Sequence, residues 1–257
     1  MAEMTAERMA ASLDSDVRRG RVRVARARHR LARMLPEDVR GKRILDVGTG
    51  PGDMALYLHL IRGARVGAVD EYEGHGEDLN NYERLLERID RLGVTGMDIL
   101  KTSALDVQLD AGSYDYVLMS NVLHHMFLRG EASLERVTGF LRTVNGWLKP
   151  DGHLIIGDIG TSTLWSWARI PRRYRLAGRT VDFRSKSSDS WWTTAAVRAD
   201  FRLVRRRLVY ERSLPRSLGE VALGCLTPTL LHRLRHSRAR SAGAAENLER
   251  VLRHPLH

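Results

Sequence analysis

Apolar residues recur along this chain at two spacings, one typical of amphipathic helices and one typical of short buried strands. Helical spacing, with apolar positions three or four residues apart, is found over residues 14–35, 54–61, 79–92 and 134–148. Short apolar or β-prone runs are found over residues 44–47, 65–69, 97–100, 114–121 and 153–158. The chain therefore reads as strands and helices that follow one another in turn.

Residues 43–70 contain the most informative of these patterns, because a strand, a glycine loop, a helix and a second strand follow one another there. The loop holds glycines at alternate positions, which are Gly48, Gly50 and Gly52. Glycines let the backbone approach a ligand closely, and the loop leads into the helix at its N-terminus. Asp46 and Asp53 flank the loop, and two carboxylates suit a cationic ligand better than a phosphate.

The second strand ends at Asp70, about 20 residues beyond the glycines. Nucleoside-binding α/β domains place a carboxylate at this point, where it binds the ribose hydroxyls. Glu71 is the neighbouring candidate for the same role.

At these residues the chain resembles the class I S-adenosylmethionine-dependent methyltransferases, whose first motif is an apolar strand followed by D/E-x-G-x-G-x-G. The positions that match are Asp46, Gly48, Gly50 and Gly52. The resemblance covers residues 44–158. It implies an α/β fold, a three-layer Rossmann-like seven-stranded mostly parallel sheet with N- and C-terminal helical additions, and S-adenosyl-L-methionine as the cofactor.

The resemblance also implies which residues bind the cofactor. The glycine loop would position the methionine part, Asp70 the ribose, and Ser103 with Ala104 the adenine edge. Relatives often carry an acid at the position of Ser103, and a hydroxyl accepts a hydrogen bond more weakly than a carboxylate. The full set is Asp46, Gly48, Thr49, Gly50, Gly52, Asp70, Glu71, Ser103, Ala104 and Asn121.

The end of the strand over residues 114–121 favours the small-molecule branch of the family. Relatives that methylate exocyclic amines of bases carry two prolines there, and Ser120-Asn121-Val122-Leu123 has none. Enzymes that methylate carbon 5 of pyrimidines need a cysteine nucleophile. The single cysteine, Cys225, lies far beyond the strand ends and follows Gly224, not a proline. We therefore expect methyl transfer to oxygen or nitrogen of a small molecule.

His124 and His125 are the titratable pair nearest to the expected methyl donor. A neutral imidazole can take a proton from a hydroxyl or an amine as the methyl group moves. Adjacent helical residues point about 100° apart, so at most one of the two faces the cleft. The alternative, that both are structural, stays open, because methyl transfer can proceed by orienting the reactants alone.

Four of the five tryptophans follow the strand over residues 153–158 and are interleaved with arginines. They are Trp165, Trp167, Trp191 and Trp192. Strand ends border the cleft of open α/β sheets, and tryptophan combines a large apolar area with an N–H donor. We expect these residues to bind an apolar or aromatic acceptor, although Trp191 and Trp192 suit a core position equally well.

The domain organisation predicted from these patterns has three parts. Residues 1–43 are an N-terminal helical cap, residues 44–212 the methyltransferase domain, and residues 213–257 a basic helical tail. The resemblance implies that the cap folds over the cofactor cleft. Residues 201–204 and 207–210 are expected to be the last two strands, an antiparallel pair. The tail over residues 218–256 is expected to be a basic amphipathic helix that lies on a partner or a membrane surface.

The net charge of +11 is unevenly distributed. The first 43 residues hold 12 basic and 6 acidic side chains, and residues 159–257 hold 20 and 7, whereas the segment between them is acidic. Basic flanks attract RNA, anionic lipid or an anionic acceptor, but an arginine-rich composition, with only four lysines, accounts for them equally well. RNA methylation, and a regulatory subunit that binds S-adenosylmethionine without turnover, are the two alternative functions.

The remaining composition narrows the class of protein. A single cysteine excludes a disulfide framework and a zinc–thiolate cluster, and no carboxylate trio calls for Mg²⁺, so no metal is expected. No apolar segment reaches the roughly 18 residues needed to span a bilayer, and the N-terminus lacks the apolar core of a signal peptide. We expect a cytoplasmic enzyme.

Overall fold

The structure is a computed structural model of the 257-residue chain. It describes residues 5–13, 17–31, 34–72, 80–126, 134–159, 173–176, 179–182, 189–209 and 229–236. The chain divides into two compact units, each described here by itself. Unit 1 comprises residues 1–118 and 147–152, and unit 2 comprises residues 119–146 and 153–257.

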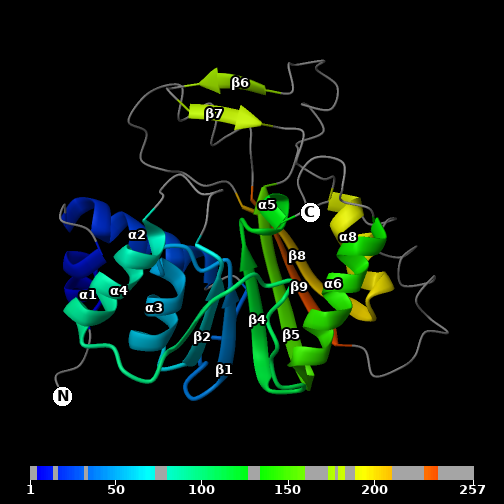
Figure 1. The fold of residues 1–257 in the computed structure, drawn as a ribbon, viewed down its shortest axis with the longest axis horizontal. Coiled ribbons are helices and arrows are strands. Elements are labelled where there is room, and N and C mark those ends of the chain that lie inside the picture. Colours follow the sequence, from blue (N-terminus) through cyan, green and yellow to red (C-terminus); the bar gives the residue numbers. More distant parts are fainter. Residues whose placement is uncertain are drawn as a thin grey trace. The chain divides into compact units, whose positions relative to one another are not determined.

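Helices and strands follow the predicted alternation through the first 159 residues (Figure 1). The helices are α1 (Ala6–Leu13), α2 (Val17–Leu31), α3 (Asp53–Leu60), α4 (Asn81–Leu92), α5 (Leu123–Met126), α6 (Leu134–Trp147) and α8 (Asp189–Arg198). The strands are β1 (Arg43–Val47), β2 (Arg65–Asp70), β3 (Asp98–Lys101), β4 (Tyr114–Ser120), β5 (Leu148–Ile159), β6 (Arg173–Leu176), β7 (Arg179–Asp182), β8 (Phe201–Val209) and β9 (Thr229–His236).

The main sheet has the strand order β3-β2-β1-β4-β5-β9-β8, and β6 and β7 form a separate hairpin. Strands β1, β2 and β3 pair in parallel, whereas β9 pairs antiparallel with both β5 and β8. The five strands from β3 to β5 are the Rossmann-like part, and β9 with β8 extend it. The predicted α/β class and Rossmann-like fold are confirmed.

The start of β1 is anchored to the neighbouring strands through Asp115. Its Oδ2 accepts the backbone N–H of Arg43 at 2.9 Å and a proton of Lys149 Nζ at 2.8 Å. Burial alone would raise the pKa of Asp115, but the Lys149 hydrogen bond, the Arg43 amide and the nearby lysine charges hold that pKa below its usual range. Asp115 is therefore ionised, and its contacts hold together the ends of the strands that lie opposite the glycine loop.

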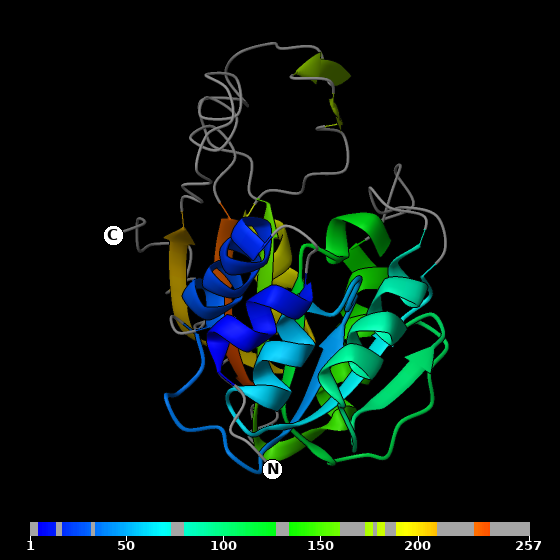
Figure 2. The same cartoon turned by 90° about the vertical axis from the view of Figure 1, so that its left-hand side faces the viewer.

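The four helices of unit 1 form one group beside β1 and β2 (Figures 1 and 2). Helix α3 packs on β2, α2 packs on α3, and α1 packs on both α2 and α4. The apolar face predicted for α2 is buried at Val24 and Ala27. Helix α2 ends at Leu31, four residues before the predicted end, and α1 was not predicted. That this segment covers the cofactor cleft stays a prediction.

Helix α4 ends where its sequence predicts, because Gly93 adopts a left-handed conformation with φ 62° and caps the last turn. The helical spacing of α4 predicts an apolar face of Tyr82, Leu85, Leu86 and Ile89, and this prediction is wrong at Leu86. Leu86 is 42% exposed, whereas Arg88, which the periodicity places outside the apolar set, is only 6% exposed.

Two predictions about the C-terminal part are wrong. Residues 201–204 and 207–210 were predicted as a pair of strands, but residues 201–209 form the single strand β8, which has an irregularity between Leu203 and Arg205, and Tyr210 lies outside the described residues. The partner of β8 is β9, so residues 229–236 are a strand and not part of a helix, and the sheet continues past residue 212. The remainder of the tail lies outside the described residues.

In unit 2, a buried side-chain amide of α6 contacts the residue that follows α8. Asn145 Nδ2 donates a hydrogen bond to the carbonyl oxygen of Ala199 at 2.8 Å, and α8 packs on β8. Among the helices that the structure describes, none has the length and hydropathy of a membrane-crossing segment.

Candidate functional site

The glycine loop leaves β1 in a conformation that only glycine adopts without strain. Gly48, Gly50 and Gly52 all have positive φ, at 73°, 53° and 82°. The loop is attached to β2, because the Gly48 N–H donates to the carbonyl oxygen of Val69 at 2.8 Å. Thr49 is buried, and its Oγ1 donates to the backbone oxygen of Asp46 at 2.8 Å. The Thr49 hydroxyl therefore holds the loop together from within.

Asp70 connects the end of β2 to this loop. Its Oδ2 accepts the backbone N–H of Gly50 at 2.7 Å, and its Oδ1 accepts the N–H of Tyr72 at 2.7 Å. A carboxylate has about four acceptor positions, so two remain for the hydroxyls of a ribose. Glu71, in contrast, is exposed. The geometry favours Asp70 over Glu71 as the ribose ligand.

Tyr72 is a residue that sequence reasoning missed. It is a non-glycine residue with φ 57°, it is buried, and its ring centroid lies 4.9 Å from that of Tyr82. Its hydroxyl has no hydrogen-bond partner among the described residues. Burial, reinforced by the charges of Asp70 and Asp46, raises the pKa of the Tyr72 hydroxyl, so it stays protonated. In the sequence, only its position two residues after Asp70 could have marked Tyr72 as a candidate site residue.

The loop that follows β3 begins next to Asp70, because Asp70 pairs with Lys101 and its carbonyl oxygen accepts the N–H of Thr102 at 3.0 Å. Ser103 starts a turn in this loop, and its Oγ accepts the N–H of Leu105 at 3.3 Å. One lone pair and the O–H of Ser103 remain available. Ala104 is buried beside it. The strand register therefore brings the predicted adenine-binding positions to the predicted ribose ligand.

Asp46 is the most perturbed acid of the site. It is 2% exposed, and burial, together with the nearby Asp70 carboxylate, raises the pKa of its carboxyl to about 7. A bound cation would favour the ionised form. Asp46 and Asp70 therefore fit a cofactor that carries positive charge, and the glycine backbone and the free acceptor positions of Asp70 fit S-adenosylmethionine.

The raised pKa of Asp46 predicts how stability depends on pH. Between about pH 4, where an unfolded aspartate ionises, and pH 7, the folded protein holds a proton that the unfolded chain has released. The free energy of unfolding therefore falls by roughly 1.4 kcal/mol per pH unit across this window through this group alone. Urea denaturation at several pH values should show that the slope is lost in Asp46→Asn.

Asp115→Asn is the matched control for that measurement. The pKa of Asp115 is lowered, so its stabilising contribution is present above about pH 4 and is lost only below it. Asp115→Asn should lower stability by a similar amount at every pH from 5 to 7 and keep the wild-type slope. Equal slopes in wild type and Asp46→Asn would mean that Asp46 is already ionised at pH 5.

The remaining predicted site residues belong to unit 2. Asn121 follows β4 with φ 56°, its N–H donates to the carbonyl oxygen of Gly157 at 2.6 Å, and its buried Oδ1 has no partner among the described residues. His124 and His125 lie on the backbone of α5 directly after it. Trp191 and Trp192 lie on α8, whereas Trp165 and Trp167 fall outside the described residues. For the histidines and these tryptophans, the predicted roles stay predictions.

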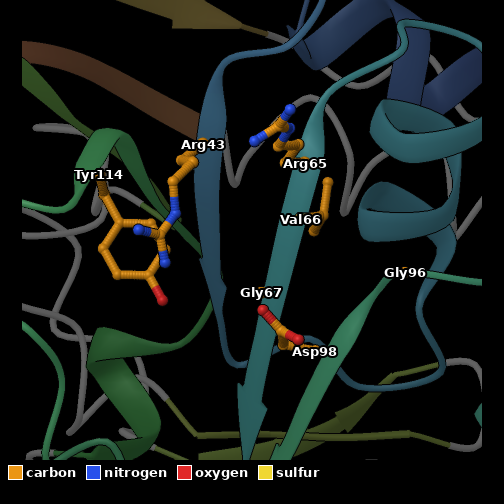
Figure 3. Close-up of a pocket in the computed structure, with 7 residues that line it drawn as sticks. All are labelled: Arg43, Arg65, Val66, Gly67, Gly96, Asp98 and Tyr114. Atoms are coloured by element: carbon orange, nitrogen blue, oxygen red, sulfur yellow. The ribbon is translucent and has the colours of Figure 1, made fainter.

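A pocket of unit 1 lies at the other ends of the strands (Figure 3). Its volume is about 350 Å³, and it is lined by Arg43, Arg65, Val66, Gly67, Gly96, Asp98 and Tyr114. Four of these residues begin β1, β2, β3 and β4, whereas the glycine loop follows the end of β1. The Arg43 guanidinium lies over the Tyr114 ring, 5.1 Å from its centroid. This pocket is separate from the cofactor-binding residues.

Within the part of the chain that the structure describes, no cluster of three or more His, Cys, Asp or Glu side chains is arranged to hold a metal ion.

Comparisons with solved structures show the same fold. An S-adenosylmethionine-dependent methyltransferase from Mesorhizobium loti is 22% identical, with a TM-score of 0.58, and the alignment covers 82% of this chain and 98% of that one. Phosphoethanolamine N-methyltransferase 2 from Haemonchus contortus, in complex with S-adenosylhomocysteine, is 15% identical, with a TM-score of 0.58 and coverage of 84% and 53%.

A third structure is geranyl diphosphate C-methyltransferase from Streptomyces coelicolor A3(2), in complex with Mg²⁺, geranyl-S-thiolodiphosphate and S-adenosylhomocysteine. It is 12% identical, with a TM-score of 0.60, and the alignment covers 84% of this chain and 77% of that one. No curated protein matches the chain by sequence.

The family model of a methyltransferase domain matches residues 18–204, which is more than half of the chain. This range includes the glycine loop, Asp70 and β3 with its loop, so the matched residues are those that the geometry assigns to the cofactor. The chain therefore belongs to the class I S-adenosylmethionine-dependent methyltransferases.

Proposed function

We propose that this enzyme transfers the methyl group of S-adenosylmethionine to an oxygen or nitrogen atom of a small, apolar or aromatic acceptor. The observation that carries the cofactor assignment is Asp70, which contacts the glycine loop and retains acceptor positions for the ribose. Bound there, the cofactor supplies an electrophilic methyl group on a sulfonium. The chain itself must then hold the acceptor atom in line with that methyl group.

Asn121 offers a ligand a polar contact at the end of β4. Its buried Oδ1 accepts no hydrogen bond from the described residues, and a buried polar atom without a partner costs roughly 1 to 3 kcal/mol. A donor on a ligand would remove that cost. The residues after β4 also lack the two prolines of the base-amine enzymes. The structural neighbours include both an N- and a C-methyltransferase. The choice of oxygen or nitrogen as the methylated atom therefore rests on the sequence motifs of this chain.

Mass spectrometry of extracts incubated with isotopically labelled S-adenosylmethionine tests this proposal. We expect label on one or a few small molecules, and only when the enzyme is present. Label confined to RNA would replace the proposal by RNA methylation through the basic flanks. Tight cofactor binding without transfer to any extract component would indicate a regulatory subunit instead.

Replacing His124 or His125 by alanine tests for a general base. If one imidazole removes the acceptor proton, its replacement should lower turnover by about a hundredfold or more and leave affinity for S-adenosylhomocysteine nearly unchanged. The other histidine is the matched control, because adjacent positions on α5 point in different directions. Loss of turnover, cofactor affinity and melting temperature together would show a structural role.

Replacing Trp191 or Trp192 by alanine tests the acceptor pocket. We expect a raised acceptor KM, while the affinity for S-adenosylmethionine stays within about threefold of wild type, or roughly 0.7 kcal/mol. Kinetics and calorimetry measure the two quantities separately. If both variants merely unfold, these tryptophans belong to the core of unit 2.

A further inference from the structure

Arg88 of α4 is a buried arginine in unit 1 that the methyl-transfer chemistry does not use. It is 6% exposed. Its guanidinium donates to three acceptors: Nη1 to the carbonyl oxygen of Pro51 and to Asp53 Oδ1 at 3.0 Å, and Nη2 to the carbonyl oxygen of Leu13 at 2.6 Å. Arginine is almost never fully buried unless it is paired, so this position depends on these partners.

The three acceptors come from segments far apart in the sequence. Pro51 belongs to the glycine loop, Asp53 is the first residue of α3, and Leu13 is the last residue of α1. One planar guanidinium with five N–H donors can bind all three at once, whereas a lysine ammonium cannot reproduce that geometry. Arg88 therefore links the cofactor loop to the N-terminal helix.

Neighbouring side chains extend this link. The second oxygen of Asp53 pairs with Arg23 of α2 at 2.9 Å. Arg91, three residues after Arg88 on α4, donates to the carbonyl oxygen of Ser12 at 3.2 Å. The last carbonyls of a helix lack partners within it and attract cations, so Arg88 and Arg91 together hold the C-terminal end of α1.

Helix α4 also contacts the glycine loop through an apolar side chain. A Cβ on Gly52 would lie 2.3 Å from Leu85 Cδ1, which shows how closely the two segments approach. Leu85 is fully buried and lies three residues before Arg88, on the same face of the helix. The loop is therefore held on one side by α4, at the Pro51 carbonyl and at Gly52.

We propose that Arg88 is a positioning residue that couples S-adenosylmethionine binding at the glycine loop to the docking of α1 and α2. Arg88 contacts both the loop and α1, and Asp53, directly after the loop, contacts α2. A ligand that stabilises the loop therefore also stabilises the docked helices. Thermodynamic linkage is reciprocal. If the bound cofactor favours docking of the helices, then undocking the helices lowers the affinity for the cofactor. The inference rests on cofactor binding and is independent of the acceptor.

The coupling is tested with S-adenosylhomocysteine, which binds without turnover, on the full-length chain. Calorimetry measures its affinity, and hydrogen exchange of residues 6–13 and 17–31 is followed with and without it. In the wild type, saturating ligand should slow exchange in both segments. In Arg88→Met the affinity should fall by about tenfold, and the slowing of exchange caused by the ligand should disappear.

Arg91→Met is the matched control, because the hydrogen bond of Arg91 goes to α1 at Ser12 and not to the loop. Because the Arg88 contacts with the loop and with α1 remain in this variant, α1 should stay docked, the affinity for S-adenosylhomocysteine should stay within threefold of wild type, and the ligand should still slow exchange. A purely structural role of Arg88 would instead lower stability while both the affinity and the ligand-dependent slowing persist.

Asp53→Asn keeps the test decisive if Arg88→Met does not fold. It removes the charge that Arg23 and Arg88 share while Arg88 retains its two backbone acceptors. We expect the ligand-dependent slowing to be lost first in residues 17–31. Wild-type affinity together with wild-type slowing in the folded variant would overturn the proposal, as would a wild type whose N-terminal exchange does not respond to the ligand.

Discussion

Asp70→Ala is expected to lower the affinity for S-adenosylhomocysteine by roughly 10²- to 10⁴-fold. Each hydrogen bond to a charged acceptor contributes roughly 1.5 to 3 kcal/mol, and a ribose offers two hydroxyls to the free positions of this carboxylate. The substitution also leaves the backbone N–H groups of Gly50 and Tyr72 without their acceptor. Isothermal calorimetry measures the loss directly.

Glu71→Ala is the control for this prediction, because Glu71 is the adjacent acid and is exposed. Its affinity should remain within about threefold of wild type, or roughly 0.7 kcal/mol. Asp70→Asn separates charge from geometry, since the amide oxygen can still accept from one backbone N–H. Should Asp70→Ala bind normally and Glu71→Ala fail to bind, the ribose ligand is Glu71.

Gly52→Ala is expected to destabilise the protein by roughly 2 to 5 kcal/mol and to impair cofactor binding. The left-handed conformation of Gly52, with φ 82°, costs a residue with a side chain roughly 1 to 2 kcal/mol. Overpacking against the buried Leu85, whose Cδ1 would lie 2.3 Å from the new Cβ, adds roughly 1 to 3 kcal/mol. Urea denaturation gives the free energy of unfolding.

Comparison with Gly50→Ala isolates the packing contribution to the effect of Gly52→Ala. Gly50 also has positive φ, but a Cβ there meets nothing within 4 Å, so only the conformational cost remains. The difference between the two variants measures the clash with Leu85. Leu85→Ala should be less destabilising in the Gly52→Ala background than alone, because it removes the clashing methyl groups. Additive effects in that cycle would contradict the close approach of α4 to the loop.

Local patterns predicted most of unit 1. The segment from β1 through the glycine loop, α3 and β2 to Asp70 is read from short-range signals, namely an apolar run, glycines at positive φ and helical spacing. Gly93 ends α4 for an equally local reason. These features form where expected because each is decided by residues within a few positions of it.

The C-terminal strands were beyond such reasoning. Leu230, Leu231 and Leu234 of β9 fit a helical spacing as well as a strand, and the neighbouring Arg233 and Arg235 resemble the polar face of a basic helix. The strand exists because its backbone pairs with β5 and with β8, which ends 20 residues before β9 begins. Pairing between distant segments leaves no periodic signal in a single strand.

Arg88 shows the same limit at the level of a side chain. In the sequence it is one of many arginines on a helix, and charged positions are by default assigned to solvent. It is buried because acceptors from α1, the glycine loop and α3 meet at one point beside α4. No window of sequence contains all three.

The sequence by itself determined the class of fold and the cofactor, and it predicted the residues that bind the cofactor, because the motif from Asp46 to Asp70 is continuous and its spacing follows from strand and helix geometry. The tertiary structure favours Asp70 over Glu71 as the ribose ligand, since the Asp70 carboxylate accepts the Gly50 amide. It also decided that β9 completes the sheet and that Arg88 joins the N-terminal helices to the loop. These are contacts between segments distant in the chain, and such contacts exist only once the chain has folded.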